Sequence, residues 1–262
     1  MDRRARGGRL VHRTPEGGVI GRALRAQARS FAGDIVLLGV TVAALLMSLS
    51  LAMSIPPDLA GAPLEAREAL AGSLTAVIAM YGAVLAAVYG SFRYTVDRRD
   101  GVIAQRLMLQ SRWVTLLVRV PGAVVGGAVV SLAGMVGGHL ALTVTVGGIP
   151  VEWSTVGSTL AVGAVAGLWG MGLGVVVQVH LVALFLVSLS MSGPVLLAML
   201  WGAGAVYLPP LVMLEAFRLD IGALGVAATD RLDGSLAAGV TAGWMVAALL
   251  AGALAFLRRD VT

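Results

Sequence analysis

Residues 154–200 read STVGSTLAVGAVAGLWGMGLGVVVQVHLVALFLVSLSMSGPVLLAML and contain no Asp, Glu, Lys or Arg. About 20 apolar residues, each rising about 1.5 Å along a helix, are enough to cross the hydrocarbon core of a bilayer. The stretch holds two such segments, Ser154–Val177 and Leu181–Leu200, joined by a tight turn at Gln178–His180. It therefore predicts two consecutive membrane-spanning helices.

The rest of the chain repeats this pattern in four further apolar segments: Ile35–Ile55, Ala69–Phe92, Pro121–Val146 and Leu236–Leu257. The 262 residues are 58% hydrophobic and only 13% charged, whereas soluble domains carry about a quarter charged residues. Too little polar surface remains to coat a water-soluble globule. The sequence therefore predicts an all-α membrane protein with a transmembrane domain of six helices over residues 35–257.

All 19 basic residues are arginines, and they gather beside the predicted spans. With a cytoplasmic N-terminus, the short turn at Gln178–His180 and three longer segments face the cytoplasm: residues 1–34, 93–119 and 258–262. These segments hold every arginine except Arg67, Arg218 and Arg231. The positive-inside rule describes this bias. It predicts a multi-pass protein of the cell (plasma or inner) membrane with both termini in the cytoplasm, and it explains the net charge of +5 without a nucleic-acid partner.

The first cytoplasmic segment divides into two parts. Residues 1–16 are rich in Arg and Gly and lack an apolar period, which predicts a flexible tail. In residues 19–31 apolar side chains alternate with arginines, a pattern typical of an amphipathic helix bound to anionic membrane lipid. The alternative is that the tail continues to the first span. Asp34 follows, at the position of a helix cap for that span.

Residues 201–235, between the fifth and sixth spans, are too long for a turn and too apolar for a free loop. Pro209-Pro210 is expected to interrupt any helix there. We expect an extracellular excursion of short helices that re-enter the outer half of the membrane and pack on protein. The alternative is a loop on the extracellular surface. Within the fifth span, Gly193-Pro194 is expected to kink or divide the helix.

Glycines in the fourth span follow one helical face, and small residues let two membrane helices approach closely. We expect four of them to pack against neighbouring helices: Gly163, Gly167, Gly170 and Gly174.

His139 is the one imidazole well inside a span. It is a candidate for lining a transport pathway, with ordinary packing as the alternative. Ion-coupled carriers place ionisable groups near the membrane centre, and the predicted spans hold almost none. This scarcity argues against a proton-coupled antiporter.

The longest cytoplasmic connection is RYTVDRRDGVIAQRLMLQSRWVTLLVR, residues 93–119. A helix is expected from Asp100, because acids near a helix start interact favourably with its dipole. The basic residues around it would meet a cytoplasmic partner first. The alternative is an ordinary basic loop.

Cysteine and lysine are both absent from the sequence, and each of these absences excludes chemistry. Without cysteine there is no disulfide, thiolate metal site or cysteine nucleophile. Without lysine there is no phosphate-binding P-loop of the form GxxxxGK[ST]. If ATP drives this protein, we therefore expect a P-loop ATPase on another chain to bind it.

In this connector and in its layout of spans the chain resembles the ABC-2 family, the membrane-spanning subunits of ATP-binding-cassette exporters. The resemblance rests on Asp97-Arg98-Arg99-Asp100-Gly101, on Leu107-Met108-Leu109 with Ser111-Arg112, and on the ending Phe256-Leu257-Arg258-Arg259-Asp260. Val102 and Arg119 depart from the family pattern, in which Thr and Lys are common.

The resemblance implies a non-catalytic permease without its own cofactor. This permease would pair with a second copy or a paralogue and dock a cytoplasmic ABC ATPase subunit, which holds the ATP and Mg. It also implies efflux of an amphiphilic or hydrophobic drug, antibiotic, peptide or lipid-like molecule along a path between the two permease halves. The docking residues would be Asp97, Arg98, Arg99, Asp100, Gly101, Arg106, Leu107 and Arg112.

Two other functions stay open at this point. One is a secondary carrier, which the lack of central acids and of evident inverted repeats opposes. The other is a non-transporting membrane scaffold or immunity protein.

Overall fold

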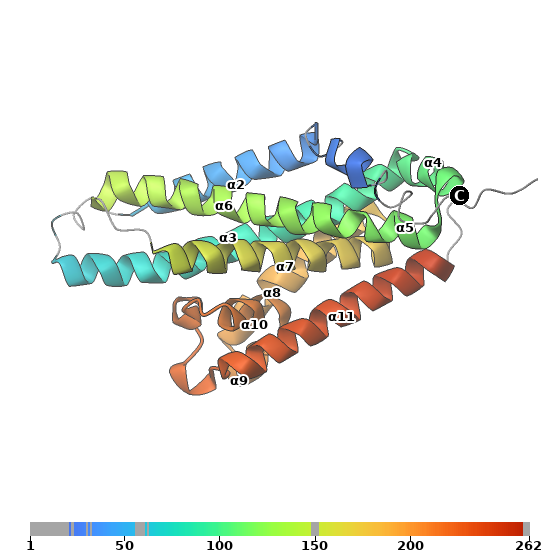
Figure 1. Ribbon diagram of the computed structural model, residues 1–262. Helices are drawn as coiled ribbons and strands as arrows, with labels where there is room; N and C mark the ends of the chain where they lie inside the picture. Colours follow the sequence, from blue (N-terminus) through green and yellow to red (C-terminus); the bar gives the residue numbers. More distant parts are fainter. Residues whose placement is uncertain are drawn as a thin grey trace, which may run out of the picture.

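The computed structural model describes residues 21, 24–29, 31, 33–55, 61, 63–147 and 152–258, and the regular structure in these ranges is entirely helical. Figure 1 shows long helices running side by side, with two short helices, within residues 102–117, at one end of the bundle. The α-helices are α2 (Ile35–Met53), α3 (Leu64–Arg99), α4 (Val102–Leu109), α5 (Arg112–Leu117), α6 (Arg119–Val146), α7 (Trp153–Val177), α8 (His180–Ala198), α9 (Gly202–Ala205), α10 (Pro209–Ala216) and α11 (Gly234–Arg258). Two 3-10 helices, η2 (Ile221–Leu224) and η3 (Ala228–Asp230), precede α11.

Five helices in the described part of the chain are long and apolar enough to cross a membrane. These segments are Glu65–Arg99, Arg112–Thr145, Trp153–Val177, His180–Ala198 and Gly234–Arg258. Helix α2 contributes a shorter apolar stretch, Ile35–Leu51. The chain is therefore an all-helical, multi-pass membrane protein.

The centre of the bundle is formed by α3, α6 and α7, with α2 packed on α6 and α11 packed on α7. Glycines allow backbones to meet in this centre. A Cβ added to Gly170 of α7 would lie 1.8 Å from the carbonyl oxygen of Ala87 in α3, and one added to Gly90 would lie 2.0 Å from that of Gly167. Helices α3 and α7 are thus in direct backbone contact.

The glycine stripe of α7 faces two different neighbours. Gly163 and Gly167 lie against α6, where an added Cβ would come within 2.5 Å of the carbonyl oxygens of Gly127 and Ala123 respectively. Gly170, as described above, lies against α3, and Gly174 meets Ser91 one turn further along α3. The stripe therefore seats α7 in the groove between α3 and α6.

Proline acts differently at the two predicted breaks. A kink or a division was expected at Gly193-Pro194; helix α8 continues through Pro194, so the helix is not divided there. A proline inside a helix removes one backbone hydrogen bond, which costs stability. On this helix Pro194 is buried together with Met191 and Ala198, and their burial offsets part of that cost. Helix α9 ends before the Pro209-Pro210 pair, as expected, but these prolines then begin α10. Proline is tolerated there because N–H groups of the first helical turn lack intrahelical acceptors.

The connector predicted over residues 93–119 is mainly helical. Helix α3 continues through it to Arg99, beyond the predicted end of the span at Phe92. The backbone then turns at Gly101, whose φ of 73° lies in the left-handed region that glycine adopts readily. Helix α4 follows from Val102, two residues later than the start expected at Asp100.

Much of the N-terminal segment lies outside the described residues, including the predicted tail 1–16. Of the expected amphipathic helix 19–31, the described residues are 21, 24–29 and 31, and all are helical. Within residues 201–235, the first six residues of α10 are buried against the rest of the chain.

Candidate functional site

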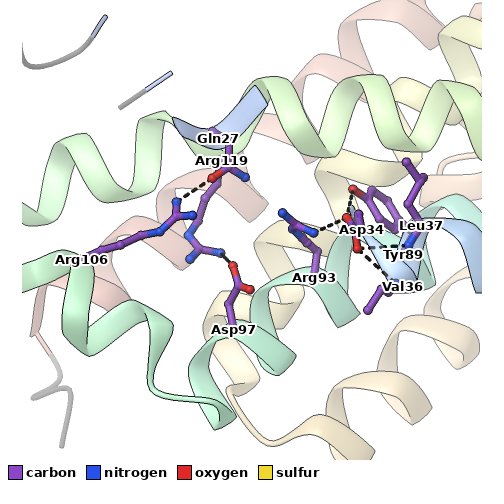
Figure 2. A network of polar contacts seen from close by, with 9 residues as sticks. All are labelled: Gln27, Asp34, Val36, Leu37, Tyr89, Arg93, Asp97, Arg106 and Arg119. Atoms are coloured by element: carbon purple, nitrogen blue, oxygen red, sulfur yellow. Dashed lines mark hydrogen bonds and ion pairs between the residues drawn. The ribbon is translucent and has the colours of Figure 1, made fainter. Parts of the chain in front are cut away.

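One face of α3 carries three polar side chains near its end. Tyr89, Arg93 and Asp97 follow each other at intervals of four residues, so they line one side of the helix. Figure 2 shows Tyr89 and Arg93 pointing toward Asp34, which precedes α2, and Asp97 pointing toward Arg119 of α6. We call these three residues together with Gln27, Asp34, Arg106 and Arg119 the polar network.

Asp34 ties the start of α2 to α3. Its Oδ1 accepts hydrogen bonds from the backbone N–H groups of Val36 at 3.1 Å and Leu37 at 3.2 Å, which confirms the predicted helix cap. Its Oδ2 accepts a hydrogen bond from the hydroxyl of Tyr89 at 3.1 Å and forms an ion pair with Arg93. Asp34 is 8% exposed, and these four contacts compensate the cost of burying its charge.

Asp97 ties the end of α3 to the start of α6. Its Oδ2 accepts a hydrogen bond from Nη1 of Arg119 at 2.7 Å, and Arg119 is only 4% exposed. The guanidinium also lies over the ring of Tyr94, 5.7 Å from the ring centre, in cation–π geometry. Nε and Nη2 of Arg119 have no hydrogen-bond partner among the described residues. Asp97 is therefore the main compensation for this buried positive charge.

Arg106 connects α4 to the N-terminal helical residues. Its Nη1 donates a hydrogen bond to the side-chain oxygen of Gln27 at 2.6 Å, and Gln27 is buried. Burial lowers the pKa of Arg106, and repulsion from Arg119 lowers it further. An arginine still stays charged at neutral pH. The contact therefore places a partly desolvated cation between two elements that are far apart in sequence.

Arg112, at the start of α5, binds the end of α11. Its Nη1 donates to the carbonyl oxygens of Phe256 at 3.4 Å and Leu257 at 3.0 Å. The last carbonyls of a helix lack intrahelical partners, and a cation there also interacts favourably with the helix dipole. Phe256 in turn meets the ring of Tyr94 edge-on, at 6.4 Å between ring centres. The end of α11 is thereby fixed to both α5 and α3.

His180 provides a similar contact for α8. Its Nδ1 lies 2.9 Å from the hydroxyl oxygen of Thr95, and its ring stacks on Phe92 at 4.3 Å. The start of α8 is therefore also held by the end of α3. The C-terminal end of α3 is therefore a meeting point of helices. It lies in contact with α2, α4, α6, α8 and α11.

The predicted docking residues separate into two groups in the structure. Asp97, Arg106 and Arg112 are partly buried and hold helices together through the contacts above, and Leu107 packs on a buried cluster around Ile103. The others lie in or near the turn between α3 and α4: Arg98, Arg99, Asp100 and Gly101. Among these, Arg99 and Asp100 are exposed, whereas Arg98 is partly buried.

An apolar surface lies next to these residues. Met108 is 85% exposed, Leu109 86% and Trp113 53%. A groove of about 460 Å³ separates α4 from α5 and is lined in part by Leu107, Met108 and Arg112. Exposed apolar residues beside arginines are typical of a protein or membrane contact. We call Met108, Leu109 and Trp113 the α4–α5 surface.

Sequence reasoning missed Tyr89, Arg93, Arg119 and Gln27 as members of one cluster. In the sequence, Arg93 is notable only as part of the arginine bias, and Arg119 also as a departure from the ABC-2 family pattern. The four-residue spacing of Tyr89, Arg93 and Asp97 was a usable signal for a polar face on α3. The partners on the other elements carry no such signal, because contacts between distant segments depend on the fold.

His139 lies far from the polar network. It is half-buried and lines a cavity between α3, α6 and α7, toward the opposite end of the bundle. No group of three or more His, Asp or Glu residues in the described part of the chain is arranged to hold a metal ion.

Comparison with known proteins adds no further constraint. Neither a scan against protein-family models nor a search of curated proteins gave a match.

Proposed function

We propose that this chain is the membrane-spanning subunit of an ATP-driven exporter of the ABC-2 type. In this proposal α2 also crosses the membrane, as the first of six spans. Its 19 residues rise about 28 Å at 1.5 Å each, close to the roughly 30 Å of a hydrocarbon core. The termini and the α4–α5 surface face the cytoplasm, and the short helices before α11 lie in the outer half of the membrane.

The observation that carries the proposal is the α4–α5 surface. It combines exposed apolar side chains with exposed charges at Arg99 and Asp100, and it lies at the end of the bundle where several helices meet (Figure 1). Apolar anchors that are surrounded by polar residues are typical of protein interfaces. The occupant is an ABC ATPase subunit, which supplies the nucleotide site that a chain without lysine cannot form as a P-loop.

The contacts of the polar network, together with those of Arg112, give a route for coupling. Movement of α4 would act on the N-terminal helical residues through Arg106 and Gln27. Movement of α5 would act on α11 through Arg112, and the end of α3 joins α2 and α6 through Asp34 and Asp97. ATP binding by two docked ATPases would thus rearrange the spans. A second permease copy or paralogue completes the path for an amphiphilic or hydrophobic cargo.

Charge placed on the α4–α5 surface is expected to abolish ATPase docking. In the variant Met108→Glu/Leu109→Glu, two exposed anchors become acids, so folding is retained while the apolar contact is lost. We expect a P-loop ATPase to purify with the wild-type chain from native membranes in mild detergent. Capture by the double variant should fall at least tenfold, as measured by quantitative mass spectrometry.

The matched control is Trp153→Glu, at the start of α7. This residue is 85% exposed and lies at the opposite end of the bundle, so the same chemical change should leave capture unaltered. Purification of the wild-type chain without any ATPase would refute the exporter proposal and favour a carrier or scaffold.

The membrane orientation can be tested with single cysteines, because the natural chain contains none. Leu109 and Trp153 are both highly exposed, so Leu109→Cys and Trp153→Cys should be accessible and well folded. We expect a membrane-impermeant maleimide to label Trp153→Cys in intact cells, and to label Leu109→Cys only after permeabilisation. The reverse pattern would invert the topology and exclude a cytoplasmic partner on the α4–α5 surface.

A further inference from the structure

A cavity of about 450 Å³ lies between α3, α6 and α7. Its α3 wall is about 20 residues before the end of that helix, which corresponds to about 30 Å at 1.5 Å per residue. It therefore lies toward the end of the bundle away from α4. A second cavity of about 670 Å³ shares Arg218, Leu219 and Asp220 with it. We call the first the distal cavity; its size is within the roughly 300–1,000 Å³ of small-molecule sites.

The walls of the distal cavity combine apolar and polar groups. Ala76, Ile78 and Leu142 are buried apolar lining residues, and His139 adds an imidazole. Thr159 also lines the cavity and is 1% exposed, and its hydroxyl has no hydrogen-bond partner among the described residues. A buried hydroxyl without a partner is costly. The walls therefore suit an apolar ligand that also offers a hydrogen-bonding group.

Arg218 stands at the rim in an unusual backbone conformation. After α10, the N–H of Leu219 donates to the carbonyl of Leu214 at 3.0 Å, and that of Arg218 donates to the carbonyl of Glu215 at 2.9 Å. This is a Schellman ending, in which the residue at the position of Arg218 adopts left-handed geometry and is usually glycine. Arg218 has a φ of 60°. The fold thus tolerates strain there while retaining a charged side chain.

The guanidinium of Arg218 forms no ion pair with any described residue. Asp220 is instead paired with Arg231 and accepts a hydrogen bond from the N–H of Gly222 at 3.0 Å. The bond from Gly222 and the contact with Arg231 lower the pKa of Asp220, so this acid stays charged within its own pair. Burial raises the pKa of Glu215, and its buried Oε2 has no hydrogen-bond partner among the described residues. Arg218 is therefore available to an anionic group from outside the chain.

The opposite charge comes from Glu152, which precedes α7 and also lines the distal cavity. Its carboxylate accepts only a long hydrogen bond from the hydroxyl of Ser154, at 3.4 Å, and it forms no ion pair with any described residue. Arg218 and Glu152 are both exposed. The rim therefore offers one cation and one anion, neither of them in an ion pair with a described residue, beside an apolar wall.

We propose that the distal cavity binds a zwitterionic amphiphile. Its anionic group pairs with Arg218, its ammonium group pairs with Glu152, and its apolar part lies against Ala76, Ile78 and Leu142. A purely anionic ligand would meet the charge of Glu152, and a purely cationic one that of Arg218. Zwitterionic phospholipids and small apolar peptides share this chemistry. The site belongs to this chain alone and does not depend on the exporter proposal.

The test uses the purified full-length chain in a neutral detergent and isothermal titration calorimetry with four probes. Two are zwitterionic, dihexanoyl phosphatidylethanolamine and the dipeptide Leu-Leu. The others are the anionic dihexanoyl phosphatidylglycerol and the cationic decyltrimethylammonium. We expect at least one zwitterion to bind at least tenfold more tightly than either singly charged probe. Binding of the phospholipid identifies a lipid ligand, whereas binding of the dipeptide alone identifies a free small molecule.

The variant Arg218→Gly separates binding from folding. Glycine relieves the left-handed strain, so thermal stability should be equal or higher, while affinity for the zwitterion should fall at least tenfold. Glu152→Gln should give a similar loss, and Arg258→Ala, at the far end of the bundle, should give none. Undiminished binding by Arg218→Gly, no binding by the wild type, or equal affinity for a singly charged probe would overturn the proposal.

Discussion

Replacing Gly170 with alanine is expected to lower the free energy of unfolding by about 3 kcal/mol, because the new methyl group has no space. Its Cβ would lie 1.8 Å from the carbonyl oxygen and 2.5 Å from the carbonyl carbon of Ala87. Both atoms belong to the backbone of α3, so no side chain can rotate away. Helices α3 and α7 must separate, and the close van der Waals contact that stabilises membrane helix pairs is then lost. Reversible unfolding in mixed detergent micelles measures this change.

Gly157→Ala is the matched control in the same helix. Nothing lies within 4 Å of a Cβ at this position, and alanine is about 0.5–1 kcal/mol more favourable than glycine inside a helix. The control should therefore unfold at the same denaturant concentration as the wild type or a higher one. Equal stability of the Gly170 and Gly157 variants would contradict the direct contact of α3 and α7.

Replacing Asp97 with alanine is the other change with a large expected effect. Arg119 is 4% exposed and has Asp97 as its charged partner, at 2.7 Å. Removal of one member of a buried ion pair typically costs about 3–5 kcal/mol, because the other charge stays buried without compensation. We expect a loss near the lower value, since the ring of Tyr94 still contacts the guanidinium. Thermal unfolding and denaturant titration both report this loss.

A double-mutant cycle identifies the source of that loss. Arg119→Met removes the buried cation and retains much of its apolar volume, so Asp97→Ala/Arg119→Met should be more stable than Asp97→Ala alone. The two single changes should therefore cost more in sum than the double change. Additive costs would mean that the two side chains do not interact, and the anchoring of α6 to α3 would need another explanation.

Five of the six predicted spans coincide with helices that are long and apolar enough for a membrane. Their predicted ends lie within two residues of the helix ends, except for α3, which begins five residues earlier and ends seven residues later than predicted. This agreement has a simple cause, since a run of apolar residues depends on the solvent of the chain and hardly on its neighbours. The position of a helix end was harder to predict from the sequence where the apolar run is followed by charged residues. Helix α3 continues past Phe92 because the charged residues after it find partners on other elements, as Arg93 does with Asp34.

The candidate site was predictable only in part. The connector drew attention through its charge, but sequence reasoning assigned Asp97, Arg106 and Arg112 to one outward surface. In the structure these side chains turn inward to α6, to Gln27 and to α11. A charged residue looks the same in sequence whether it meets water or a buried partner. The exposed apolar residues Met108 and Leu109 are the better candidates for a docking contact.

Three features could be predicted from the amino-acid sequence: that the chain is a membrane protein, where its long helices lie, and that Asp34 caps α2. Each depends on local composition or on the backbone next to the residue. The tertiary structure alone decided that Gly163 and Gly170 face different helices, that Arg119 is buried beside Asp97, and that Arg218 stands beside a cavity. These features join segments that are distant in the chain, and only the packing of whole helices brings such segments together.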